Sequence, residues 1–166
     1  MAEDPSLRLW MVGDGPYRSE CTRIVRDLGI GDRVRFAGFI DRSVIDEYYV
    51  AADLFVFASI TETQGLVIQE AMMHGLPAVV VAGGGATNAI NAGVNGFLAR
   101  NDPVDFASYI LRLTSSDELY AKMGEAAARS VRSQGIPEMA ERVVSVYRDV
   151  INARQPTVDQ PFARAK

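Results

Sequence analysis

The sequence contains only one cysteine and one histidine among its 166 residues. A single cysteine, Cys21, cannot form an internal disulfide, which is typical of a protein from a reducing compartment. One cysteine and one histidine are also too few for a structural zinc site. No apolar run reaches the roughly eighteen residues that a membrane-spanning helix needs, and the acidic start lacks the basic region of a signal peptide. We therefore expect a cytoplasmic protein.

The sequence also lacks an excess of positive charge. It has 17 Lys and Arg against 21 Asp and Glu, which gives a formal net charge of −4. Because neutralisation of nucleic-acid phosphates needs a basic surface, we expect no nucleic-acid partner. The hydrophobic fraction of 48% and the charged fraction of 23% are ordinary for a globular chain of this length. We predict one domain over residues 7–152 and a flexible tail over 153–166, which has two prolines and no periodicity.

Residues 59–75 are the most informative stretch. The preceding run, 54–58, is short and rich in aromatic and β-branched residues, which is typical of a buried strand. From Gly65 onward the apolar residues fall at helical spacing, and Gly75 suits a left-handed C-terminal cap before Pro77. The stretch therefore predicts a strand, a loop and a helix.

The predicted loop combines an anion-binding feature with two acids. Unpaired N–H groups at a helix N-terminus favour an anion such as phosphate, and Gly65 lets the backbone approach a ligand closely. Glu62 and Glu70, separated by seven residues, add carboxylates that accept hydrogen bonds from sugar hydroxyls. The combination suits a sugar attached to a phosphate. Taken alone, the two residues are more readily interpreted as a solvated loop acid and an exposed helix acid than as a binding site.

The rest of the chain alternates strands with helices. Further strands are expected at 7–12, 34–36, 78–82 and 97–99. Helices are expected at 17–28, 103–113, 117–133 and 137–152. Another helix should run to Ala51 from an N-cap at Asp41 or Ser43, and a short helix should end at Ile90. In the 17–28 helix we expect Ile24, Val25 and Leu28 to face inward, and in the last helix Met139, Val143, Tyr147, Val150 and Ile151 lie near one face. This order predicts an α/β fold: an open, parallel, Rossmann-like sheet with helices on both faces.

At this point the residues resemble a known family. Residues 59–77 follow the pattern Ser-x-x-Glu-x-x-Gly-Leu-Val-x-x-Glu-Ala-Met-x-x-Gly-x-Pro, which closely resembles the signature of family 4 glycosyltransferases, retaining enzymes of the GT-B fold. The resemblance extends over about 7–151 and includes Gly13-Asp14-Gly15-Pro16, Phe36-x-Gly38, Gly84-Gly85 and Gly93-x-x-Gly96. It implies the C-terminal, donor-binding half of GT-B. The partner would be a nucleotide diphosphate sugar, whose sugar is transferred to a lipid or saccharide acceptor without a cofactor or an essential metal.

The resemblance also implies roles for individual residues. Glu62 would be the catalytic residue that contacts hydroxyls of the donor sugar, and Glu70 would bind the ribose hydroxyls. The other donor-binding positions would be the backbone of Thr63, Gln64, Gly65 and Leu66 at the sugar and diphosphate, the Gly13 loop at the interdomain cleft, and the backbone near Phe39 and Ile40 beside the base. Lone His74 is expected at a helix end rather than as a catalytic base.

The sequence departs from the family pattern in three places. Thr63-Gln64 replaces a frequent Gly-Phe, a variant that resembles enzymes acting on lipid acceptors, so contact with a membrane would be peripheral. Asn88 stands where family members commonly carry a Glu. The resembling domains also begin with an additional strand, followed by an Arg and a Lys that help to hold the diphosphate, and they follow an acceptor-binding domain. We therefore predict a fragment of a longer enzyme, inactive alone.

The absent strand would lie between the strands at 7–12 and 54–58. Their open edges would pair with each other directly or recruit another chain, which makes homo-association a further expectation. Two alternatives to a transferase remain at this stage: a noncatalytic sugar-nucleotide binding module, and a GT-B nucleotide-sugar epimerase.

Overall fold

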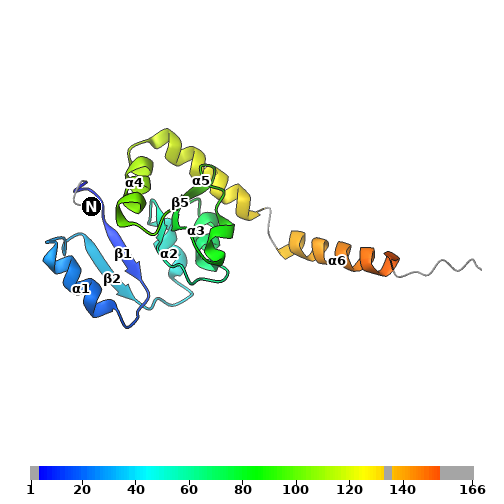
Figure 1. The fold of residues 1–166 in the computed structure, drawn as a ribbon, viewed down its shortest axis with the longest axis horizontal. Coiled ribbons are helices and arrows are strands. Elements are labelled where there is room, and N and C mark those ends of the chain that lie inside the picture. Colours follow the sequence, from blue (N-terminus) through cyan, green and yellow to red (C-terminus); the bar gives the residue numbers. More distant parts are fainter. Residues whose placement is uncertain (1–3, 133–135, 154–166) are drawn as a thin grey trace, which may run out of the picture.

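The structure is a computed structural model that describes residues 4–132 and 136–153 (Figure 1). Strands and helices alternate through its first hundred residues, and three helices follow. The strands are β1 (Leu9–Val12), β2 (Val34–Gly38), β3 (Phe55–Phe57), β4 (Ala78–Val81) and β5 (Gly96–Ala99). The helices are α1 (Arg18–Asp27), α2 (Ile45–Val50), α3 (Leu66–Met73), the 3-10 helix η1 (Gly85–Ala89), α4 (Pro103–Thr114), α5 (Asp117–Arg132) and α6 (Ile136–Ala153).

The strands form two separate parallel sheets. β1 pairs with β2, and β3, β4 and β5 pair in that order. The predicted α/β architecture with parallel strands and helices on both faces is confirmed. In the described part of the chain β1 and β3 do not pair with each other, so direct pairing does not close the predicted gap. Each of these two strands keeps one edge without a strand partner among the described residues.

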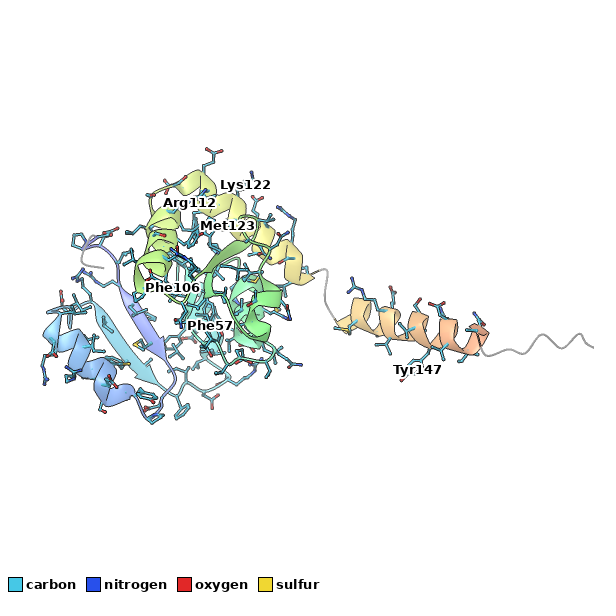
Figure 2. The ribbon with its side chains drawn as sticks, in the orientation of Figure 1. Phe57, Phe106, Arg112, Lys122, Met123 and Tyr147 are labelled. Carbon is cyan, nitrogen blue, oxygen red and sulfur yellow. The ribbon has the colours of Figure 1, made fainter. Side chains whose placement is uncertain are left out.

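The core is built around β4, whose four residues are all buried. Ala78 and Val80 lie in a cluster with side chains of α3 and η1, and Val79 points the other way, into a cluster with α4. Helix α5 contributes Ala127 to the first cluster and Met123 to the second. In Figure 2 the labelled Phe57, Phe106 and Met123 lie in this central region. An uninterrupted apolar strand is thus covered on both faces, as its sequence predicts.

The β1–β2 unit buries much less. Ile24 is 43% and Leu28 65% exposed, so the prediction that these two residues face inward is wrong. Val25 is half-buried. A sheet of two strands offers only a narrow apolar surface. It can therefore bury only part of the apolar face of the amphipathic helix α1. On β1, Trp10 is 47% exposed and meets Tyr48 of α2 edge to face, with ring centroids 5.5 Å apart.

The start of α2 also differs from the sequence-based expectation. Neither Asp41 nor Ser43 is the N-cap, because the cap position is Val44 and no side chain bonds there. The Asp41 carboxylate instead accepts hydrogen bonds from the backbone N–H of Ser43 at 2.8 Å and from its hydroxyl at 2.6 Å. This local turn competes with capping for the same side chains.

Helix α6 extends away from the rest of the molecule in Figure 1. Its described side chains are exposed, including Tyr147, which Figure 2 labels. The apolar residues of its predicted face are therefore exposed as well: Met139, Val143, Tyr147, Val150 and Ile151. Of the predicted tail, Ala153 closes α6, and 154–166 lie outside the described residues. Over the described ranges, no helix is long and apolar enough to cross a membrane.

Candidate functional site

The loop between β3 and α3 folds around the carboxylate of Glu62. Its Oε1 atom accepts hydrogen bonds from the backbone N–H groups of Thr63 at 2.9 Å, Gln64 at 3.1 Å and Gly65 at 3.3 Å. Gly65, at φ +65°, turns the chain into the helix in a left-handed conformation that favours glycine. The N–H groups of Gln64, Gly65 and Thr63 stabilise the ionised carboxyl and lower the pKa of Glu62. The backbone N–H groups that were predicted to bind an anion are thus bonded to the carboxylate of Glu62.

A glycine-rich loop after β4 closes on this turn. The backbone N–H of Gly85 donates to the carbonyl oxygen of Glu62 at 2.7 Å. A Cβ built on Gly85 would overlap the carbonyl group of Thr63, so a larger residue cannot fit unless one loop moves. Gly84, at φ +59°, lies in the left-handed region as well. Glycine at positions 84 and 85 is therefore needed for close contact between the two loops.

Glu70 lies in the middle of α3, and its two carboxylate oxygens have different partners. Oε1 contacts Nη1 of Arg42 at 2.6 Å, and Oε2 accepts a hydrogen bond from the hydroxyl of Tyr49 at 3.1 Å. The Arg42 side chain is 81% exposed and that of Glu70 is 23% exposed. Tyr49 is buried, and burial, reinforced by the charge of Glu70, raises its pKa to about 12. The tyrosine is therefore a neutral donor at physiological pH.

His74 lies behind this group, at the end of α3. Its ring stacks on Tyr49 with centroids 5.4 Å apart, and its Nδ1 lies 2.9 Å from the carbonyl oxygen of Glu70. Its Nε2 is 3.7 Å from the carboxylate of Asp46 on α2. These contacts join α2 to the C-terminal end of α3, which agrees with the expectation that His74 serves the helix end.

The other predicted donor-binding positions follow the carboxyl ends of two strands. Gly13, directly after β1, has φ +106° and donates its N–H to the carbonyl oxygen of Gly38 at 2.7 Å. Ile40, shortly after β2, is half-buried, and Phe39 is 83% exposed. Leu66 opens α3 with its side chain 57% exposed. The structure thus brings Glu62, Thr63, Gln64 and Gly65 into one hydrogen-bonded turn beside Gly85, one helical turn or more before Glu70.

Two residues of the site were missed by sequence analysis. Arg42 and Tyr49 hold Glu70 from 28 and 21 positions earlier in the chain, and no local pattern links residues at such separations. Tyr49 had one available signal, since a tyrosine that is buried needs a hydrogen-bond partner for its hydroxyl.

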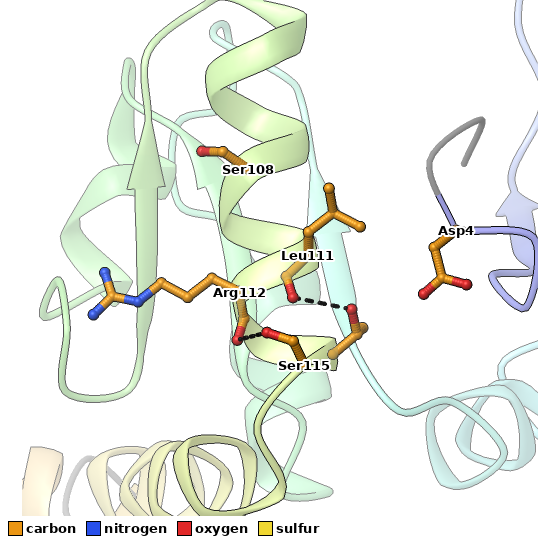
Figure 3. A pocket seen from close by; sticks show the side chains of 6 residues that line it. Asp4, Ser108, Leu111, Arg112 and Ser115 are labelled. Atoms are coloured by element: carbon orange, nitrogen blue, oxygen red, sulfur yellow. Dashed lines mark hydrogen bonds between the residues drawn. The ribbon is translucent and has the colours of Figure 1, made fainter.

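A separate hollow of about 430 Å³ lies beside the C-terminal half of α4 (Figure 3). Its hydroxyl groups are already engaged, because Thr114 donates to the carbonyl oxygen of Leu111 at 3.3 Å and Ser115 to that of Arg112 at 3.2 Å. Asp4 lies across the hollow from these residues. None of the predicted site residues lines this hollow. Nowhere in the described residues do three or more His, Cys, Asp or Glu side chains form a group that could hold a metal ion.

Comparisons with known proteins identify the family of the chain. The family model described as glycosyl transferases group 1 matches residues 1–130. The chain is 33% identical over 163 residues to a D-inositol 3-phosphate glycosyltransferase of Thermomonospora curvata, which covers 90% of this chain and 38% of that protein. It is 35% identical over 144 residues to an N-acetyl-alpha-D-glucosaminyl L-malate synthase of Bacillus anthracis, covering 86% of this chain and 36% of that enzyme.

Solved structures show the same relationship. A sucrose-phosphate synthase from Thermosynechococcus elongatus superposes with a TM-score of 0.75 at 30% identity, covering 92% of this chain and 41% of that one. Anabaena HepE in complex with UDP-glucose gives a TM-score of 0.73 at 30% identity, with coverage of 86% and 42%. The chain spans less than half the length of each of these relatives, and the structural neighbours are glycosyltransferases of the GT-B fold. With its matched residues 1–130 and the Glu62–Glu70 turn and helix inside them, the chain belongs to the group 1 glycosyltransferases.

Proposed function

We propose that this chain binds the nucleotide diphosphate sugar for a retaining glycosyltransferase that transfers the sugar to a lipid or saccharide acceptor. The longer relatives support a second, acceptor-binding part of the enzyme, because the matched region is about two fifths of their length. In this proposal the 166 residues bind the donor, and the other part of the enzyme binds the acceptor, whose hydroxyl is the nucleophile.

The observation that carries the proposal is the arrangement around α3. In the turn before α3, three consecutive N–H groups already hold an anionic oxygen, that of Glu62, and within α3 a buried tyrosine holds Glu70 in place. An anion site next to a fixed carboxylate matches the chemistry of a diphosphate joined to a ribose. The crystal structure of the related HepE, 30% identical, is of a complex with UDP-glucose, which supports a nucleotide sugar as the ligand class.

Donor binding would rearrange Glu62. The diphosphate or the sugar would take over N–H groups of Thr63, Gln64 and Gly65, and the released carboxylate would turn to hydroxyls of the donor sugar. Glu70 would meanwhile bind the ribose. Hydrogen-bond donors fixed in advance around the leaving diphosphate would stabilise the charge that develops as the glycosidic bond breaks, which is a large term in transfer reactions of this kind. No metal is needed for these steps.

Donor screening tests the proposal. The purified chain is titrated calorimetrically with UDP-, GDP- and ADP-sugars, and we expect one nucleotide class to bind. The same donor is then given to a protein that includes the acceptor-binding part, with lipid and saccharide acceptors and product analysis by mass spectrometry. A folded chain that binds none of the donors would refute the proposal. Conversion of the donor sugar without an acceptor would favour the epimerase instead.

A further inference from the structure

The two oxygens of the Glu70 carboxylate have very different surroundings. Oε2 is bonded to the hydroxyl of Tyr49, a residue that is only 7% exposed and whose ring stacks on His74. Oε1 is bonded to the guanidinium of Arg42, whose side chain is 81% exposed. One partner is locked by packing on several sides, and the other reaches in from solvent.

We propose that Tyr49 is a positioning residue that fixes Glu70 for the ribose, and that Arg42 is an exchangeable partner that the ribose hydroxyls displace from Oε1. This inference rests on the proposed function, since it assigns separate tasks to the two oxygens of the residue expected to bind ribose. Neither residue belongs to the sequence pattern that identifies the family.

Tyr49 suits the positioning task because its hydroxyl has a fixed protonation state and a fixed place. Burial raises its pKa to about 12, so it donates to Glu70 throughout the physiological range. Its ring is held between Phe55, at a centroid distance of 6.1 Å, and His74, at 5.4 Å. His74 in turn lies within hydrogen-bond distance of the Glu70 carbonyl oxygen. The carboxylate and the main chain of Glu70 are thus tied to the same aromatic stack.

Arg42 suits the exchangeable task because its contact with Glu70 lies at the surface. Ion pairs with a solvent-exposed partner contribute little to stability, since water and salt screen the charges and the long side chain must be ordered. Replacing this contact with hydrogen bonds from ribose therefore costs little. The released guanidinium remains beside the site as a positive charge near an anionic ligand.

The test compares UDP with its 2′,3′-dideoxy analogue by calorimetry on the 166-residue chain. The measured quantity is the affinity ratio between the two nucleotides, because a general loss of structure or of charge weakens both. Tyr49→Phe removes the hydroxyl and keeps the ring, with Tyr48→Phe on the same helix as its control. Arg42→Ala removes the exposed cation, with Arg129→Ala on α5 as its control, since Arg129 is also in an exposed ion pair.

For Tyr49→Phe we expect the UDP affinity to fall roughly tenfold, as for loss of a hydrogen bond to a charged group, and the dideoxy affinity to change less than about twofold. For Arg42→Ala we expect the ratio to shift about two- to fivefold in favour of UDP. Equal losses for both nucleotides in Tyr49→Phe would reduce Tyr49 to a structural role and overturn the inference. An unchanged ratio in Arg42→Ala would overturn the exchange. No binding of UDP, GDP or ADP by the wild-type chain would instead refute the proposed function itself.

Discussion

A methyl group at Gly85 should push apart the two loops that form the candidate site. A Cβ at this position needs a separation of at least 3.0 Å from neighbouring atoms, yet it would overlap the carbonyl of Thr63. The backbone N–H of Gly85 donates to Glu62, and alanine keeps that N–H. The effect of Gly85→Ala therefore comes from the added carbon alone.

The size of the effect follows from this overlap. Overpacking of a tight contact costs about 1–3 kcal/mol, and for a domain of this size each kcal/mol lowers Tm by about 2–4 °C, so we expect a decrease of roughly 2–12 °C. Relief of the overlap moves Thr63 by on the order of 1 Å, and misplacement of that size can lower an enzymatic rate about a hundredfold. Binding of UDP should weaken as the amides around Glu62 move.

Gly31→Ala is the matched control. A Cβ on Gly31 meets nothing within 4 Å, its backbone is not left-handed, and it lies in the turn between α1 and β2. Thermal melting and calorimetry with UDP are measured for both variants. If Gly85→Ala melts at the same temperature as Gly31→Ala and binds UDP equally well, the two loops are not in the contact that the structure shows, and the explanation of the glycine-rich loop is wrong.

Three further predictions concern the carboxylates and the sheet edges. Glu70→Ala should weaken nucleotide binding roughly ten- to a hundredfold, since it removes a charged acceptor, whereas Glu62→Ala should mainly lower the transfer rate of the longer enzyme; unchanged calorimetric affinity for the Glu70 variant would remove its ribose role. Because the pKa of Glu62 is lowered in the folded state, its contribution to stability is complete above the ordinary pKa of 4.5 and is lost as the pH falls through the lowered pKa. Urea unfolding should therefore show a loss of stability in acid, and this loss should be smaller in Glu62→Gln. The 166-residue chain alone should not sustain sugar transfer, and sustained turnover would contradict this prediction. Light scattering should show that the chain self-associates through the open edges of β1 and β3, and a monomer at all concentrations would contradict that prediction.

Local sequence signals predicted those parts of the fold that depend on neighbouring residues. The run at 78–82 predicts a strand buried on both faces, and β4 is one. Gly75, at φ +80°, and the proline after it end α3 where the pattern places the end. These predictions succeed because strand burial and helix termination are determined by a few consecutive residues.

Predictions that depend on distant partners failed or could not be made. Helical spacing identified α1 correctly, but the exposure of Ile24 and Leu28 depends on how many strands the helix covers, which the helix sequence does not contain. The links of Arg42 and Tyr49 to Glu70 likewise depend on how α2 packs against α3. The pattern of two glutamates indicates the candidate site, while the side chains that hold Glu70 come from tertiary packing.

The separation of the two sheets bears directly on donor binding. The expected base-binding backbone near Ile40 follows β2, while Glu62 and Glu70 belong to the β3–α3 unit, so the proposed donor would span both sheets. The described residues place no strand pairing between these units, and Trp10 against Tyr48 is a contact that joins β1 to α2. A nucleotide sugar bound across them would itself link the two units. Ligand binding should therefore raise the Tm of both units together, by an amount that the ligand concentration relative to Kd determines. Any chain segment that pairs with β1 and β3 should tighten nucleotide binding, since it orders the two halves of the site before the ligand arrives.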